Sequence, residues 1–164
     1  MPIVEYTAEK GLVQKSGTTA SLDLQGQIFG NRVSVMSVSD AVTLTAADSG
    51  KTILATPKNG AGYDITLPKL DSTNNVEGLY FRIILAATGG GANEDVSIKQ
   101  NHANDDFVGH IIADDGVTSG ANQARIRFDQ STGAVAGDSV ECFASDTKWF
   151  IRAHAETTAG VVFI

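Results

Sequence analysis

The sequence contains a single cysteine, Cys142, among its 164 residues, so no disulfide can form within one chain. Because Cys142 lies in a predicted strand, we interpret it as a small buried apolar residue instead of a reactive thiol. Aromatic residues make up only 7% of the chain, which is little for a sugar-binding cleft. No apolar run approaches the about 20 residues that a membrane-spanning helix requires. We therefore expect no membrane partner.

Basic residues are also scarce and scattered. The chain has 12 Lys and Arg against 19 Asp and Glu, which gives a formal net charge of −7. Phosphate binding depends on a clustered basic face, so we expect no nucleic acid partner. The first residues, MPIVEYTAEK, lack the charged leader and apolar core of a signal peptide, and we expect cytoplasmic synthesis without an export signal.

What the sequence does contain is glycine, with 17 residues, together with many Thr, Val, Asp and Asn. Short segments with a period of two recur between turn residues, and no window has a convincing helical period. We predict roughly nine to eleven short strands, with turns about every 8 to 12 residues. The expected strands cover residues 33–38, 42–44, 52–55, 63–67, 79–87, 95–99, 107–112, 123–128, 140–144, 149–153 and 161–164.

These features predict an all-β fold, an antiparallel β-sandwich or jelly-roll-like domain over residues 33–164, with a small closed barrel as the alternative. Residues 79–87 (LYFRIILAA) contain one charge and suggest a central strand covered on both faces or a strand at a subunit interface.

The clearest local prediction is a hairpin within Gly137 to His154. Apolar residues alternate with polar ones on both sides of a short polar turn, which places one set on a buried face. The expected buried set consists of Val140, Cys142, Ala144, Trp149, Ile151 and Ala153. The only tryptophan, Trp149, would anchor a core otherwise built from aliphatic residues.

Residues 1–32 differ from the rest because their apolar residues are scattered, with no sustained period of two. We predict an extended N-terminal arm, too apolar to be a free linker, that lies against its own domain, a neighbouring subunit or another protein. The predicted contact residues of the arm are Ile3, Val4, Tyr6, Leu12, Leu22, Leu24, Ile28 and Phe29.

No group of side chains is arranged in the sequence for catalysis or for a cofactor. The acidic stretch from Asn93 to Asp106, with Asp114 and Asp115, has calcium-ligand chemistry but the wrong spacing for a helix-loop-helix site. The three histidines, His102, His110 and His154, stand far apart. A carboxylate pair of Glu77 and Asp95 leaves a carbohydrate-active enzyme or lectin as a minority hypothesis. We predict no catalytic, cofactor-binding or metal-binding residue, and a protein that is not an enzyme.

The order of four segments resembles a pattern in virion structural proteins of tailed bacteriophages, especially capsid decoration (cement) proteins and β-rich modules of head and tail fibres. The segments are VTLTAADSGKTIL (42–54), DITLPK (64–69), GLYFRIIL (78–85) and GDSVECFASDTKWFI (137–151). Where many relatives have Asp-Gly in the hairpin turn, this chain has Asp146 followed by Thr147, so a wider turn is expected.

The resemblance implies a structural protein on the capsid exterior that binds the lattice of the major capsid protein and stabilises it, commonly as a homotrimer. In such proteins an N-terminal arm often reaches onto the capsid or a neighbouring subunit, which suits residues 1–32. The alternative is a head- or tail-fibre module involved in host attachment. No catalytic or ligand-binding residue follows from the resemblance.

Overall fold

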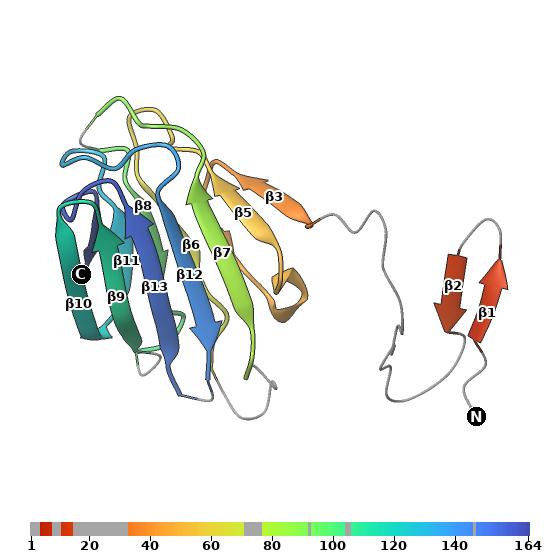
Figure 1. Ribbon diagram of the computed structural model, residues 1–164. Helices are drawn as coiled ribbons and strands as arrows, with labels where there is room; N and C mark the ends of the chain where they lie inside the picture. The colour runs from red at the N-terminus through yellow and green to blue at the C-terminus, as the bar shows by residue number, and fades with distance from the viewer. Residues whose placement is uncertain are drawn as a thin grey trace. The chain divides into compact units, whose positions relative to one another are not determined.

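The computed structural model describes residues 33–70, 77–91, 93–103, 106–145 and 147–164, and the backbone of residues 4–7 and 11–14. The chain divides into two compact units, Met1–Arg32 and Val33–Ile164. The second unit is the β-sandwich of Figure 1, in which two sheets pack face to face.

Strands dominate the described residues, and one 3₁₀ turn, η1 (Ala46–Asp48), is present. In chain order the strands are β1 (Val4–Thr7), β2 (Gly11–Gln14), β3 (Val35–Val38), β4 (Val42–Thr43), β5 (Thr52–Ala55), β6 (Tyr63–Thr66), β7 (Tyr80–Leu85), β8 (Val96–Lys99), β9 (Phe107–Ala113), β10 (Gly116–Gln123), β11 (Arg125–Phe128), β12 (Ser139–Ala144), β13 (Trp149–Ala155) and β14 (Val161–Phe163).

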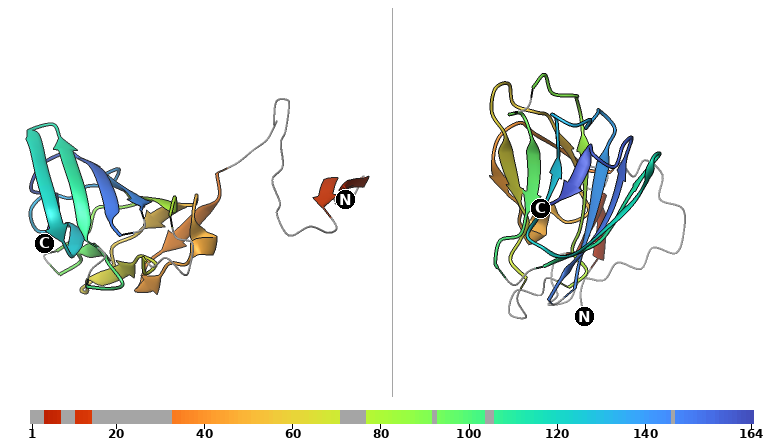
Figure 2. Two further views of the ribbon diagram at one scale, coloured as in Figure 1. Left: turned by 90° about the horizontal axis from the view of Figure 1, so that it is seen from below. Right: turned by 90° about the vertical axis from the view of Figure 1, so that its left-hand side faces the viewer.

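One sheet has seven strands in the order β10-β9-β13-β12-β7-β5-β3, and the other has five in the order β14-β11-β8-β6-β4. From β3 to β8 the chain alternates between the two sheets. Successive strands within each sheet are therefore parallel neighbours, β3 with β5 and β7, and β4 with β6 and β8. This part of the chain forms a coil of three turns, here called rungs, each with one strand from either sheet: β3 and β4, β5 and β6, and β7 and β8. The views of Figure 2 show the two layers of strands.

The predicted hairpin is confirmed. Strands β12 and β13 pair antiparallel, with Cys142 opposite Ile151 and Ala144 opposite Trp149. All six side chains expected on its buried face are buried. Trp149 is fully buried, as predicted, and its ring centroid lies 5.9 Å from that of Phe81 on β7. The expectation that the rest of the core is aliphatic is wrong, because Phe81, Phe107 and Phe128 are also fully buried.

The sandwich itself is confirmed, whereas the prediction of antiparallel sheets is corrected, because both sheets are mixed. Besides the coiled strands, β9 and β13 pair parallel from Phe107 beside Trp149 to Ala113 beside Ala155. A period of two with a short turn is common to a hairpin and to a crossing between sheets, so the pattern alone does not distinguish them.

Three further expectations differ from the structure. Strand β10 (Gly116–Gln123) was not expected, because its small and polar residues form an exposed edge strand. Residues 1–32 contain an antiparallel hairpin in which Tyr6 of β1 pairs with Leu12 of β2, although no strand was predicted there. Strand β7 lies inside its sheet, but Tyr80 and Arg82 are exposed, so a strand covered on both faces is wrong and the alternative, a strand at a subunit interface, stays a prediction.

Candidate functional site

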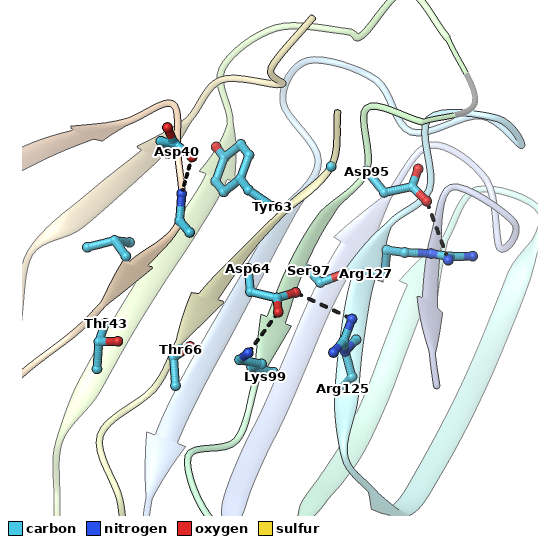
Figure 3. Close-up of a pocket in the computed structure, with 13 residues that line it drawn as sticks. Asp40, Thr43, Tyr63, Asp64, Thr66, Asp95, Ser97, Lys99, Arg125 and Arg127 are labelled. Carbon is cyan, nitrogen blue, oxygen red and sulfur yellow. Dashed lines mark hydrogen bonds and ion pairs between the residues drawn. The ribbon is translucent and has the colours of Figure 1, made fainter. Parts of the chain in front are cut away.

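A polar groove of about 620 Å³ lies over the five-stranded sheet (Figure 3). Its lining comes from β4, β6, β8 and β11 and from the segments that precede β4, β6 and β8. The lining residues are Asp40, Ala41, Val42, Thr43, Gly62, Tyr63, Asp64, Thr66, Asp95, Ser97, Lys99, Arg125 and Arg127.

Strand alternation places the polar side chains of this groove on one face. In β6, β8 and β11 the inward positions are buried aliphatic and aromatic residues, so the positions between them point away from the core. The strand register then forms two polar rows across the sheet. These rows are Asp64, Ser97 and Arg127, and Thr66, Lys99 and Arg125.

The charges of the groove neutralise one another. Asp64 accepts from Lys99 Nζ at 2.8 Å and lies 3.3 Å from Arg125 Nη1. Arg127 pairs with Asp95 at 3.4 Å and also donates to Asp129, and Figure 3 shows the first three of these ion pairs. The groove therefore offers hydrogen bonds to a polar ligand without a strong field of one sign.

Tyr63 contributes to the wall of the groove but has a structural role. Its hydroxyl lies 3.1 Å from the carbonyl oxygen of Val38 and 3.0 Å from that of Thr56. Burial, and next the charge of Asp40, raises the pKa of Tyr63 to about 12. The hydroxyl therefore stays protonated and joins the ends of two rungs of the coil.

A second surface is the side of the seven-stranded sheet that faces away from the core, here called the outer face. Figure 1 views the molecule from this side, with β9, β13, β12 and β7 in front of the other sheet. The strand register arranges its central side chains in three rows. Each row runs from β9 through β13 and β12 to β7. The aromatic row is Val108, Phe150, Phe143 and Tyr80. The charged row is His110, Arg152, Glu141 and Arg82, and the third row is Ile112, His154, Ser139 and Ile84.

The aromatic side chains of the outer face are accessible. Phe143 and Phe150 are each 49% exposed and lie opposite one another on β12 and β13. Tyr80, on the adjoining strand, donates its hydroxyl hydrogen to Glu141 at 3.1 Å. Neighbouring aromatic residues on the open face of a sheet form an apolar patch of the kind that marks an interaction surface.

The charged row is incompletely paired. Glu141 lies 3.9 Å from Arg82 Nε, a weak contact. Arg152 is exposed, and among the described residues it contacts the ring of His154 at 3.2 Å but no carboxylate. The outer face therefore presents an available cation beside a half-buried anion.

The acidic loop residues singled out in the sequence act as structural hydrogen-bond acceptors. Glu94 accepts from the backbone N–H groups of Gly60 and Gly90, which lowers its pKa. Asp95 accepts from the backbone N–H of Gln130 at 2.8 Å, and Asp115 from that of Thr158 at 2.7 Å. Within the part of the chain that the structure describes, no three His, Cys, Asp or Glu side chains gather as metal ligands.

Two of the three histidines lie on the outer face. His110 Nδ1 is 3.0 Å from Ser119 Oγ on the edge strand β10. A serine nucleophile needs a base that a third group orients, and no carboxylate contacts His110 among the described residues.

The two carboxylates considered for glycoside hydrolysis, Glu77 and Asp95, belong to different sheets. Asp95 lies in the groove over the five-stranded sheet, whereas Gly78, next to Glu77, bonds to Ala144 of the seven-stranded sheet.

The predicted contact residues of the N-terminal arm are only partly described. Val4, Tyr6 and Leu12 belong to β1 and β2, for which the backbone alone is described. The others, Ile3, Leu22, Leu24, Ile28 and Phe29, lie outside the described residues.

Cys142 is fully buried, as predicted, and burial raises the pKa of its thiol. Within the described residues, no helix is long and apolar enough to cross a membrane.

Comparisons with protein family models, with curated proteins and with solved structures find no match.

Proposed function

We propose that this protein is a virion structural protein, without enzymatic activity, that binds the outside of a capsid lattice and stabilises it. The partner is the major capsid protein, and the assembly implied by the resemblance is a homotrimer. Support comes from the order of the four sequence segments that resemble decoration proteins, together with the all-β fold in which they lie.

The observation that carries the proposal is the division of the chain into a small N-terminal unit and a separate sandwich. The N-terminal unit contains a hairpin of short strands, and the described residues of the sandwich form a core of their own within residues 33–164. A chain of this kind can attach through its N-terminal unit while the sandwich keeps its structure.

Stabilisation of a shell by such a protein follows from mass action, because a protein that binds the closed lattice but not its opened form shifts the equilibrium toward the closed form. If several copies are joined, their N-terminal units add avidity, since the later contacts become intramolecular. Strand addition to an exposed sheet edge of the capsid is a suitable contact, because it depends mainly on backbone hydrogen bonds.

The test is a binding assay with capsids that lack the protein, using the full chain and a variant without residues 1–30. We expect the shortened protein to keep its circular dichroism spectrum and cooperative unfolding but to lose most of its capsid binding. Unchanged binding of the shortened protein would contradict the role of the N-terminal unit. Failure of the full chain to bind would contradict the decoration function.

A fibre module for host attachment is the second candidate, and the polar groove favours it. Its hydroxyl, carboxylate and guanidinium groups (Figure 3) suit a polar ligand such as a glycan. In the same assay this function would appear as binding to host cells in place of capsids, and this binding would survive deletion of residues 1–30, because the groove belongs to the sandwich.

A further inference from the structure

We propose that the outer face is a self-complementary interface through which two copies of this chain pair about a twofold axis. The axis lies between the two outer faces, parallel to the strands and level with the space between β12 and β13. This inference concerns contacts between the sandwiches, so it can hold or fail independently of capsid binding, and it sets a twofold dimer against the homotrimer that the resemblance implies.

The register of the hairpin is the first reason. A twofold axis in this position lays β12 of one copy on β13 of the other at the same level along the strands. Because Phe143 is paired with Phe150 and Glu141 with Arg152 within one copy, each of these residues then meets its own strand partner from the second copy. Aromatic side chains meet aromatic side chains, and each anion meets a cation.

The strands farther from the axis match in the same way, since β7 of one copy lies on β9 of the other. Tyr80 then meets Val108, and Ile84 meets Ile112, at positions fixed by the parallel pairing of β9 with β13 and the antiparallel pairing of β7 with β12. In the next pair of strands Leu54 of β5 meets Val117 of β10. Apolar contacts therefore occur in all six strands, while the same axis places Arg82 of one copy on His110 of the other and Ser139 on His154.

Charge complementarity argues for a second copy as the occupant. Arg152 has no carboxylate partner among the described residues, and Glu141 has only the distant Arg82 and the hydroxyl of Tyr80. The twofold arrangement supplies Arg152 with the missing carboxylate at two symmetric places. A partner of another composition would have to reproduce the pattern that a second copy already has.

The area of the face is sufficient for a specific pair. Six strands spaced about 4.8 Å apart, and three rows spaced about 6.8 Å along the strands, cover roughly 600 Å² in each copy. Two such faces in full contact bury at most about 1,200 Å² in total, which is the lower end of the range for stable interfaces. Aligned packing of two twisted sheets, about 30° apart, retains contact over the central strands β12 and β13.

The first experiment is sedimentation of the full chain over a range of concentrations, with Phe150→Asp and a matched control, Ile164→Asp. The two positions are equally accessible, 49% and 48% exposed, but Ile164 follows β14 in the other sheet. We expect a concentration-dependent dimer that Phe150→Asp weakens about thirtyfold or more and that Ile164→Asp leaves intact. A parent protein that stays monomeric, or a trimer insensitive to Phe150→Asp, would overturn the proposal.

The second experiment tests the register with two variants, Glu141→Arg and Arg152→Glu. Each alone places like charges in contact at both symmetric positions, and we expect it to weaken the dimer at least about tenfold. In an equimolar mixture of the two variants, both contacts join opposite charges again, so a heterodimer should form with nearly the parent affinity. Thermal unfolding of each variant confirms its fold. A mixture that dimerises no better than the separate variants refutes the twofold register.

Discussion

Gly109→Ala is expected to destabilise the sandwich severely, although it adds only one methyl group. Gly109 lies in β9 between Val108 and His110 of the outer face, and pairs with Ile151 of β13. A Cβ at this position would lie 1.8 Å from the carbonyl oxygen of Ile151 and 2.6 Å from its carbonyl carbon. The clash is with the backbone of a strand held on both sides, so no side-chain rotation can relieve it.

The magnitude follows from the distance through which the strands must move. Ordinary contact begins at 3.4 Å, so β9 and β13 would have to separate by about 1.6 Å, enough to break the nearby ladder hydrogen bonds. Two or three lost bonds at about 1 kcal/mol each, with about 1–3 kcal/mol for disturbed packing, lower the free energy of unfolding by about 4 kcal/mol. The melting temperature should then fall by roughly 8–16 °C.

Urea denaturation followed by circular dichroism measures this change, with Gly91→Ala as the matched control. An added Cβ at Gly91 meets no atom within 4 Å, and the residue has no left-handed backbone conformation. The control should therefore remain within about 0.5 kcal/mol of the parent protein. A loss of less than about 1 kcal/mol in Gly109→Ala would refute the close approach of β9 to β13.

Two further predictions concern single side chains. Hydrogen bonds from Lys51 and then Thr45 lower the pKa of Asp48 from 3.8 to about 2. The ionised carboxylate of Asp48 therefore stabilises the folded state above about pH 4, and this stabilisation is lost as the pH falls toward 2. Asp48→Asn should therefore lower the free energy of unfolding by about 1 kcal/mol at pH 7, reduced for partial exposure, and the difference should disappear in urea titrations near pH 2. The buried Cys142 thiol, whose pKa is raised by burial, should react with a thiol reagent at pH 8 only after denaturation, and rapid labelling of the native protein would contradict its burial.

Most strands and the core could be predicted from the sequence because buried residues recur at every second position of a strand. The hairpin around Trp149 has this pattern on both strands, and its turn fixes the pairing. Pairing between distant strands is not determined in this way. The neighbours of β7 are β5 and β12, and nothing in residues 79–87 distinguishes a strand covered on both faces from one with an exposed face.

The groove and the outer face were missed because each depends on strands that are far apart in sequence. Asp64, Lys99 and Arg125 are polar residues in ordinary outward positions until the sheet order places them side by side. Phe143 and Phe150 did carry a signal, since both occupy outward positions of the hairpin where polar residues are expected. An aromatic residue at an outward position of a predicted strand therefore indicates an interaction surface.

The coil formed by β3 to β8 also determines how the protein can open. Each rung is bonded mainly to the next, as in repeat proteins, so local stability should decline from β7, which is bonded to both β5 and β12, toward the terminal strands β3 and β4. Backbone amides of β3 should then exchange with solvent through local fraying, whereas those of β7 exchange only when the whole sandwich unfolds. Among the described strands β3 forms the outer edge of the coil, so it is the strand that the coil can lose, or beside which it can gain another, with the smallest effect on β7.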